Sequence, residues 1–334
     1  MPGNTPAITA RDVRKRYRSS GAEGPPALDG FGLSVPRGTI RGLLGPNGAG
    51  KTTAVRIMTT LLDFDDGEVR VAGHDVVAAG REVRRRIGLV GQYAGVDEEL
   101  SGLQNLVMFG RLSRLSPAGA RRRANELLEQ LGLADTGGKR AADYSGGMRR
   151  RLDLAAALIV APEILFVDEP TTGLDPSARR DVWDAIRRLV DGGTTVLLTT
   201  QHLEEADRLA DDISLLARGR VVAEGTPAQL KEQVGNDWLE FDAGPDPAVA
   251  ERIAATVRPW ASGVVHVVGP HVQVPVVDRA GALLASSAAL HDAGLRPVDV
   301  IVRTPTLDEV FLQLTGAAAL DSTDHEDDAK GVPA

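Results

Sequence analysis

The chain has 334 residues, a length that corresponds to about two domains at roughly 150 residues each. Hydrophobic residues make up 43% and charged residues 25%, so a sizeable core can form and wholesale disorder is excluded. A net charge of −8 argues against general binding to nucleic acid, and the lack of cysteine excludes disulfides, thiol catalysis and metal centres built on thiolates. With no apolar run of about 18 residues and no apolar region near the N-terminus, the sequence predicts a soluble, cytoplasmic protein.

From Ile8 to about Gln233, short apolar runs alternate with helical stretches. Runs of this kind are typical of strands that are buried on both faces of a largely parallel sheet. The sequence therefore predicts a doubly wound α/β domain over residues 1–233, with a helical insert at about residues 100–143. The expected strands are Ile40–Leu44, Ile87–Val90, Ile164–Val167, Thr195–Thr200 and Ile213–Leu216.

A smaller domain is predicted over residues 234–316, after a turn-like boundary at 234–237. Its order of elements, βαββαβ, is that of the ferredoxin-like α+β fold. A last helix, Leu307–Leu314, presents one apolar face, which we interpret as part of an interaction or regulatory module; the alternative is packing on its own domain. Residues 317–334 are predicted to be a disordered acidic tail. The other elements are expected at Trp238–Phe241, Pro247–Val257, Gly263–Val268, His271–Val277, Ala280–Ala293 and Pro297–Val302.

The strongest motif is Gly45–Thr52, which fits the pattern G-x-x-x-x-G-K-[ST] between a predicted strand and a predicted helix, Thr52–Leu61. Glycines let consecutive backbone N–H groups converge on phosphate oxygens, and the positive end of the helix dipole adds to this field. Lys51 is expected to reach the β- and γ-phosphates, and the Thr52 hydroxyl to ligate Mg²⁺. A glycine-rich turn that matches by chance is the alternative, which the strand–loop–helix context disfavours. The predicted phosphate-binding residues are Gly45, Pro46, Asn47, Gly48, Ala49, Gly50, Lys51, Thr52 and Thr53.

A second motif, Asp168-Glu169, ends the predicted strand Ile164–Val167. An acid just past a buried strand belongs at the carboxyl edge of a parallel sheet, where ligands bind. Asp168 is predicted to hold the magnesium, and Glu169 to polarise the attacking water of a phosphoryl transfer. The string is a weak signal alone, because strand ends often carry acids, and it gains weight from following the phosphate motif in an α/β chain.

Between these motifs, the string Tyr144–Met148 (YSGGM) precedes a predicted long helix, Arg149–Val160. Here the sequence resembles the nucleotide-binding domains of ABC transporters, which are P-loop ATPases with a signature of the form LSGGQ; this chain differs at the first and fifth places. The resemblance implies that two copies dimerise head to tail, with each ATP between the Lys51 loop of one copy and the Ser145 loop of the other. The phosphate-binding places of the signature are intact, namely Ser145, Gly146 and Gly147.

The resemblance covers roughly residues 7–230 and implies an ATPase that uses ATP and Mg²⁺. It places Tyr17 against the adenine ring, although a lone tyrosine before a loop is commonly a surface or packing residue. It makes Gln92 the residue that links Mg²⁺ and the γ-phosphate to a transmembrane partner, with residues 92–110 as candidates for that contact. It places Asp175, in Gly173–Asp175, where the two copies sense each other.

The switch position of the family departs from its usual residue in this chain. The family usually has a histidine after the next strand, in the pattern His-x-x-Glu-Glu-Ala, whereas the string Thr200–Ala206 puts Gln201 at that place and His202 one place later. A glutamine amide can donate a hydrogen bond to the γ-phosphate but cannot shuttle a proton. We interpret Gln201 as the switch, with Lys51 and Glu169 as the other catalytic residues, and keep His202 as the alternative because predicted registers slip at element boundaries.

The C-terminal string Arg303–Gly316 resembles the ending of the daunorubicin/doxorubicin-resistance ATP-binding subunits. This resemblance implies export of a drug-like molecule through a separate transmembrane permease, with the chain peripheral at the cytoplasmic side of the membrane. The alternatives are an exporter subunit for lipid or polysaccharide, a soluble ABC-type ATPase acting on ribosomes or nucleic acid, and a binder that holds ATP without turnover.

Three arginine triplets are interpreted as solvated helix faces rather than nucleic-acid contacts: Arg84–Arg86, Arg121–Arg123 and Arg149–Arg151.

Overall fold

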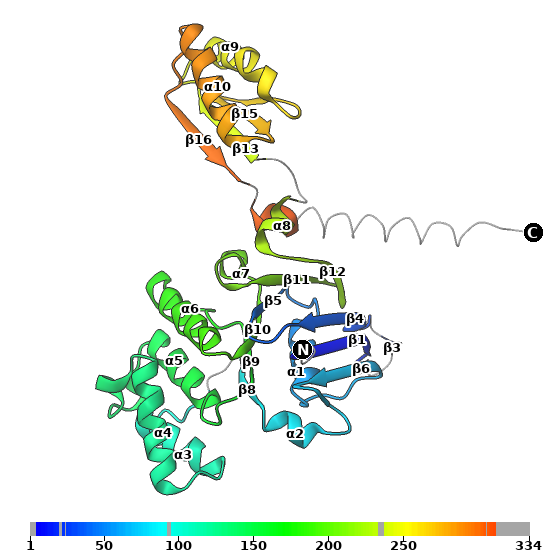
Figure 1. The fold of residues 1–334 in the computed structure, drawn as a ribbon, viewed down its shortest axis with the longest axis vertical. Coiled ribbons are helices and arrows are strands. Elements are labelled where there is room, and N and C mark those ends of the chain that lie inside the picture. The colour runs from blue at the N-terminus through cyan, green and yellow to red at the C-terminus, as the bar shows by residue number, and fades with distance from the viewer. Residues whose placement is uncertain are drawn as a thin grey trace, which may run out of the picture. The chain divides into compact units, whose positions relative to one another are not determined.

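The computed structural model of the chain describes residues 5–19, 22–23, 25–91, 95–232, 237–304 and 306–311. The chain divides into two compact units, Met1–Pro227 and Ala228–Ala334 (Figure 1). Three predictions fall outside the described residues: the role of Gln92, the boundary after residue 233 and the acidic tail. Within the described part of the chain, no helix is both long enough and apolar enough to cross a bilayer.

The first unit contains the predicted, largely parallel sheet. Its six strands lie in the order β12-β11-β5-β10-β9-β8, and only β12 runs antiparallel to its neighbour. Every residue of β5, β9 and β10 is buried, as expected for strands of a parallel sheet that is covered on both faces. Because these strands are parallel, the residues that follow each of them meet at one edge of the sheet. The strands are β5 (Ile40–Leu44), β8 (Ile87–Val90), β9 (Ile164–Asp168), β10 (Thr195–Thr200), β11 (Asp212–Ala217) and β12 (Arg220–Gly225).

A separate antiparallel sheet, which the sequence did not predict, lies in the same unit in the order β4-β1-β6-β7. Its strand β1 carries a bulge at Asp12, whose φ is 50°, and the bulge interrupts the two-residue alternation that would reveal a strand in the sequence. A core that includes Phe31, Met58 and Phe166 joins this sheet, α1 and the parallel sheet. The bounds are β1 (Ile8–Lys15), β2 (Arg18–Ser19), β3 (Ala22–Glu23), β4 (Leu28–Val35), β6 (Asp66–Val71), β7 (His74–Asp75), α1 (Lys51–Met58) and α2 (Gly80–Arg84).

A second core contains residues of the parallel sheet and of five α-helices, with Leu106, Leu127 and Leu165 among its buried members. Two of these helices, α3 and α4, occupy the predicted helical insert, and the helix after the YSGGM string begins at Gly146 rather than at Arg149 because Ser145 caps it. The bounds are α3 (Gly102–Leu112), α4 (Pro117–Gln130), η1 (Ala134–Thr136), η2 (Ala141–Asp143), α5 (Gly146–Ala157), α6 (Pro176–Asp191) and α7 (Leu203–Leu209).

The second unit has the predicted βαββαβ order, and its four strands form an antiparallel sheet in the order β14-β15-β13-β16. Helices α9 and α10 pack on this sheet around Phe241, Ile253 and Val274 (Figure 1). A short helix at 307–311 follows β16 and is capped reciprocally by Thr306 and Glu309. The bounds are α8 (Pro227–Glu232), β13 (Asp237–Asp242), α9 (Pro247–Val257), η3 (Arg258–Trp260), β14 (His266–Val268), β15 (His271–Val276), α10 (Arg279–Asp292) and β16 (Asp299–Arg303).

Candidate functional site

The loop between β5 and α1 has the backbone that the phosphate motif requires. A Cβ at Gly45 would lie 2.3 Å from the Leu216 carbonyl oxygen, so any other residue would push the loop off β11. Gly50 has a φ of 109° and would clash with the Ala27 carbonyl oxygen at 2.4 Å. Gly50 is also the N-cap of α1 and offers no side-chain acceptor to the first-turn N–H groups. These donors are therefore available to an anion.

The Lys51 ammonium lies inside this loop, on a side chain that is only 5% exposed. It donates to the carbonyl oxygens of Gly45 at 2.7 Å and Pro46 at 3.1 Å, and lies 3.8 Å from Glu169 Oε1. Burial lowers the pKa of Lys51 from its ordinary value, and the carboxylates of Glu169 and Asp168 oppose that shift. The structure thus brings the predicted phosphate cation and the predicted catalytic acid together.

Asp168 and Thr52, both predicted as magnesium ligands, face each other across the sheet edge. The Thr52 hydroxyl donates to Asp168 Oδ2 at 3.3 Å, and the Thr199 hydroxyl, from the neighbouring strand β10, donates to Asp168 Oδ1. Asp168 is buried at the end of β9. A carboxylate and a hydroxyl are hard oxygen donors of the kind that Mg²⁺ takes beside phosphate oxygens, so the pair fits this ion.

Glu169 adopts a backbone conformation that is unusual for a residue with a side chain. Its φ is 48°, in the left-handed region, and its N–H donates to the Thr199 carbonyl oxygen at 3.0 Å. Its carboxylate lies near Lys51 and accepts from the Thr172 hydroxyl at 3.5 Å. A strained residue at the end of a buried strand is a typical feature of catalytic turns.

A cavity of about 400 Å³ opens over this arrangement. Tyr17 stands beside it with 48% of its surface exposed, and its hydroxyl lies 3.3 Å from Thr53 Oγ1. An exposed aromatic ring at the mouth of a phosphate-binding cavity can stack on a base. The cavity is lined by Tyr17, Ala27, Pro46, Asn47, Gly48, Gly50, Lys51, Thr52, Thr53 and Glu169.

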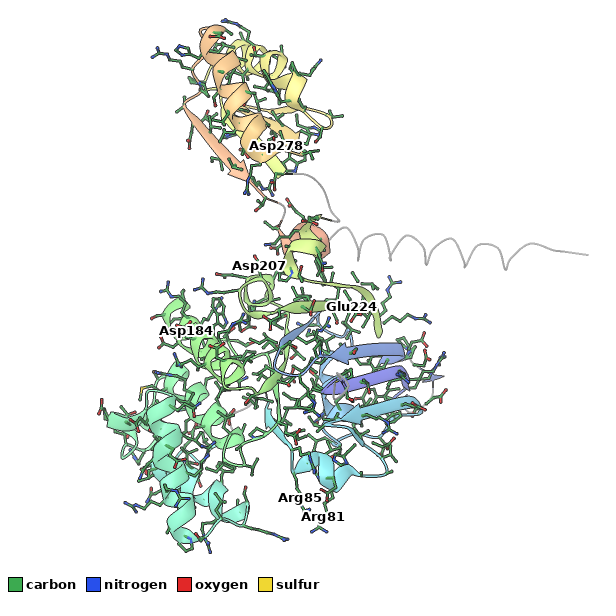
Figure 2. The ribbon with its side chains drawn as sticks, in the orientation of Figure 1. Arg81, Arg85, Asp184, Asp207, Glu224 and Asp278 are labelled. Atoms are coloured by element: carbon green, nitrogen blue, oxygen red, sulfur yellow. The ribbon has the colours of Figure 1, made fainter. Side chains whose placement is uncertain are left out.

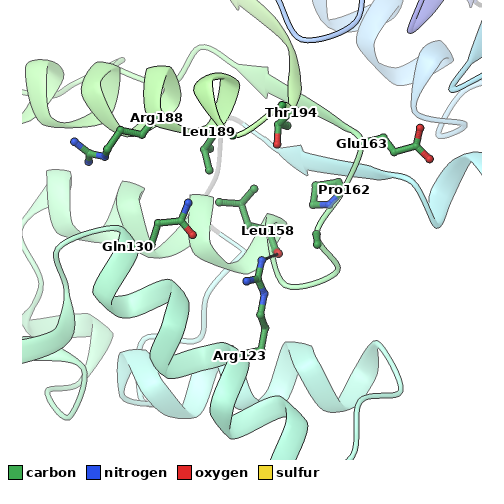
Figure 3. Close-up of a pocket in the computed structure, with 11 residues that line it drawn as sticks. Arg123, Gln130, Leu158, Pro162, Glu163, Arg188, Leu189 and Thr194 are labelled. Atoms are coloured by element: carbon green, nitrogen blue, oxygen red, sulfur yellow. Dashed lines mark hydrogen bonds between the residues drawn. The ribbon is translucent and has the colours of Figure 1, made fainter.

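A second cavity, of about 330 Å³, lies at the opposite edge of the parallel sheet. Figure 3 shows Arg123 reaching across it to the Leu158 carbonyl oxygen, a hydrogen bond of 3.0 Å. Its walls include Glu163 and Thr194, which precede β9 and β10, whereas ligands of parallel sheets bind where the strands end. None of the predicted site residues lines it, so the candidate site is the cavity at Lys51.

None of the residues of the YSGGM string lines the cavity at Lys51. Ser145 and Gly146 are exposed, and the Ser145 hydroxyl accepts from the Met148 N–H at 3.3 Å as the N-cap of α5. Tyr144, at the first place, is buried and donates to the Thr136 carbonyl oxygen at 2.9 Å; burial raises the pKa of its hydroxyl. The departure from leucine therefore supplies a hydrogen bond beneath the exposed helix end.

Asp175, predicted to act between two copies, caps its own helix. Its carboxylate accepts from the N–H groups of Ser177 at 2.9 Å and Ala178 at 3.0 Å, at the start of α6. The bond from Ala178, followed by that from Ser177, lowers the pKa of Asp175.

Gln201 directly follows β10, and His202 is the N-cap position of α7. Which of Gln201 and His202 is the switch stays a prediction.

The solvated interpretation of the third arginine triplet is wrong for Arg150. Exposed residues of the other triplets, such as Arg85 at the end of α2, do extend into solvent (Figure 2). Arg150 instead is buried and donates to the backbone of the Asp168-Glu169 turn. A buried turn has carbonyl groups that no neighbouring strand can satisfy, and a guanidinium is suited to them. The i, i+3 pairing with Asp153 on one helix face was the available signal.

Glu205, in α7, is a second residue that the sequence analysis missed. It is fully buried and accepts from the Thr171 hydroxyl at 2.9 Å and the Trp183 indole at 3.0 Å. Among the described residues, its other oxygen has no hydrogen-bond partner. Glu205 thus fastens the helix after Gln201 to the loop after Glu169.

Sequence comparisons with known proteins show which family this chain belongs to. The sequence profile of the ABC transporter family matches residues 28–172. The chain is 55% identical over 313 residues to a daunorubicin resistance ATP-binding protein of Streptomyces coeruleorubidus, covering 93% of this chain and 96% of that one. It is 48% identical to the daunorubicin/doxorubicin resistance ATP-binding protein of Streptomyces peucetius, covering 96% of each, and 38% identical to the Nod factor export ATP-binding protein I of Ralstonia nicotianae, covering 94% and 95%.

Solved structures of similar fold include an ATP-binding cassette captured as a dimer in a post-hydrolysis state with ADP and Pi. It is 26% identical, with a TM-score of 0.59, and the match covers 66% of this chain and 98% of that one. An ATP-binding subunit of an ABC transporter is 27% identical with a TM-score of 0.59, over 68% of this chain and 92% of that one. Since the matched share of this chain is about the size of its first unit, these structures bear on the cassette alone.

Proposed function

The chain belongs to the ATP-binding proteins of ABC transporters, and we propose that it drives export of a drug-like molecule through a separate membrane permease. It is an ATPase of the cassette type. The observation that carries the proposal is the match, over nearly the whole chain, to relatives named for resistance to daunorubicin and doxorubicin. The match includes the second unit, which a generic cassette does not require.

In the proposed complex, ATP lies in the cavity at Lys51. The backbone N–H groups at the start of α1 receive the phosphates, the Lys51 ammonium leaves its carbonyl partners for the β- and γ-phosphates, and the Tyr17 ring stacks on adenine. Thr52 and Asp168 are the protein ligands for Mg²⁺, and Gln92 is proposed as a third. Bound at this place, the metal would neutralise charge on the β- and γ-phosphates.

Glu169 is the proposed general base. Its carboxylate lies 3.8 Å from Lys51, so a γ-phosphate held by Lys51 is within reach of a water bound to Glu169. The negative charge would orient this water and accept its proton as the oxygen attacks phosphorus. Gln201 is the proposed donor to the γ-phosphate, which leaves the proton transfer to Glu169 because an amide cannot accept that proton.

The exposed start of α5 supports a head-to-tail dimer. The residues that would receive a γ-phosphate, Ser145, Gly146 and Gly147, do not line the cavity at Lys51, which supports a role toward a nucleotide held by a second copy. A similar cassette has been solved as a dimer with ADP and Pi. Asp175, at the start of α6, is proposed to lie at the same interface.

The proposed location is the cytoplasmic side of the membrane, where the chain would bind its permease peripherally. The second candidate for the exported molecule is a compound of the Nod factor type, because a relative named for Nod factor export matches the chain over a similar length at 38% identity. An action on nucleic acid is disfavoured by the net charge of −8.

The export proposal can be tested in cells that carry the chain together with a candidate membrane permease. We expect lower accumulation of daunorubicin in these cells than in cells with the membrane protein alone. A chain with Lys51→Ala should restore accumulation. Equal accumulation with and without the chain would contradict the drug substrate while leaving the ATPase assignment in place.

A further inference from the structure

Arg150 connects α5 to the catalytic turn. Its guanidinium donates to four backbone carbonyl oxygens: Pro170 at 2.9 Å, Asp168 at 3.0 Å, Glu169 at 3.3 Å and Gly91 at 2.6 Å. Three of these belong to consecutive residues of the turn that holds Glu169. The fourth, Gly91, directly follows β8, so one side chain fastens two segments of the sheet edge to one helix.

Asp153, one turn further along α5, completes this arrangement. Its Oδ2 lies 3.4 Å from Arg150 Nη1, and its Oδ1 accepts from the Gly95 N–H at 2.9 Å. Both side chains are buried, and burial is the largest influence on each: it lowers the pKa of Arg150 and raises that of Asp153. The pair thus binds Gly91 and Gly95, the described residues on either side of 92–94.

The same helix carries Ser145 at its start, about 7.5 Å along the axis from Arg150 at 1.5 Å per residue. Over so short a distance an α-helix moves as a rigid body, so a shift of its exposed end is passed to the carbonyl groups that Arg150 holds. A displaced Glu169 backbone moves the carboxylate relative to Lys51. An error of about 1 Å in catalytic geometry can cost roughly 10²-fold in rate.

We propose that Arg150 and Asp153 are positioning residues that make hydrolysis at Glu169 depend on nucleotide bound at Ser145 of the same chain. Because that nucleotide belongs to the partner's Lys51 loop, the pair couples the two ATP sites. The inference rests on the head-to-tail dimer proposed above. Arg150 does not line the cavity at Lys51, so it acts through the backbone that it holds at the Glu169 turn and at Gly91.

The neighbouring Arg151 supplies a matched control. It lies on the same helix and carries the same charge, yet it contacts the Leu131 carbonyl oxygen at 3.3 Å and Asp181 at 3.8 Å, away from the catalytic turn. Arg150→Met and Arg151→Met should be compared by kcat, KM for ATP, Hill coefficient and melting temperature. We expect Arg150→Met to lower kcat by about 10–10²-fold with KM little changed. The Hill coefficient should fall from between 1 and 2 to 1, while Arg151→Met keeps both values.

Arg150→Lys and Asp153→Asn test the same idea if Arg150→Met fails to fold. A lysine keeps the charge but cannot reach four carbonyl oxygens with one planar group, so kcat and the Hill coefficient should still fall. Asp153→Asn should lower kcat less, because asparagine keeps an acceptor for the Gly95 N–H. We still expect a loss of roughly 2–10-fold in kcat, because the negative charge that faces Arg150 is removed. If these folded variants retain the parental kcat and Hill coefficient, the proposal is overturned.

A parallel measurement separates this inference from the proposed function. Glu169→Gln should form a dimer in Mg-ATP, as seen by size exclusion. If it does, and Arg150→Met still hydrolyses ATP with the parental kcat and cooperativity, the coupling role alone is wrong. If Glu169→Gln stays monomeric at every ATP concentration, the dimer is wrong and the coupling with it.

Discussion

At the scale of single residues, the site is defined by two opposite charges that share a small buried space. Lys51 is held by loop carbonyls and Glu169 by the Thr199 backbone, so their 3.8 Å separation is fixed from both sides. Carbonyl oxygens are neutral partners, and a phosphate group offers a stronger, charge-assisted bond to the same ammonium. Binding of ATP would therefore replace the carbonyl partners of the Lys51 ammonium by phosphate oxygens.

Replacing Lys51 by alanine removes the only flexible cation of the phosphate motif. We expect ATP hydrolysis to fall by about 10²–10³-fold or more, because a charge-stabilising donor in a buried site is worth that much in rate. Phosphate release measures the loss, and circular dichroism checks that the fold is retained. The exposed Lys139 provides a control, since Lys139→Ala should keep the parental rate. Unchanged activity in Lys51→Ala would contradict the role of this loop.

Sequence patterns single out the residues around Lys51 because the phosphate motif has fixed spacing and its glycines have no substitutes. They failed for Arg150, since an arginine inside a triplet of arginines looks like a solvated face until the surrounding carbonyl groups are known. Thr199 and Glu205 were missed for a related reason. Thr199 forms a hydrogen bond with Asp168, and Glu205 forms one with Thr171. Both bonds join segments that are far apart in the sequence, so no local pattern predicts them.

At the scale of elements, the strands of the parallel sheet were predictable and the antiparallel sheet was not. Strands β5 and β10 contain runs of leucine, isoleucine or valine and are bounded by glycine or polar residues, so their limits could be read directly. Strand β1 alternates only until its bulge at Asp12. Pairing with β4 and β6 decides its structure, and such long-range pairing outweighs local preference.

Helix α6 gives an element-scale prediction about pH. Hydrogen bonds from Ala178 and Ser177 lower the pKa of Asp175, so its stabilising effect is present above the ordinary aspartate pKa and is lost as pH falls through the lowered value. Asp175→Ala should therefore unfold at a lower temperature than the parent at pH 7, and the gap should narrow in acid. Asp175→Asn, which keeps the cap acceptor, should show a smaller gap with less pH dependence. A gap for alanine that grows in acid would contradict the cap.

At the scale of the whole molecule, the chain combines an ATPase unit with a second unit that has its own core. Leu307 and Val310, which lie on the apolar face predicted either to interact with a partner or to pack on its own domain, are buried. Their burial favours packing within the chain as the role of this face. The proposed interaction role then belongs to the rest of the second unit or to residues beyond 311.

Deletion of residues 305–334 tests this division. We expect the truncated chain to lose part of its recruitment to membranes that contain the permease, because the interaction role is assigned to the second unit and the deletion removes two of its buried side chains, Leu307 and Val310. Sedimentation with such membranes measures recruitment, and size exclusion in Mg-ATP measures dimerisation. Deletion of 317–334 alone is the control and should change neither. If the longer deletion also changes neither, the second unit's end has no interaction role.

The central claim is that Glu169 activates water in an ATP-bound, head-to-tail dimer, and Glu169→Gln tests it most directly. The substitution keeps shape and hydrogen-bonding reach but removes the charge, so ATP should bind while hydrolysis falls by about 10²–10⁴-fold. The protein should then accumulate as a dimer, doubling its mass on size exclusion in Mg-ATP, and an added Ser145→Arg should abolish this dimer. A Glu169→Gln protein that hydrolyses ATP at the parental rate would contradict the account.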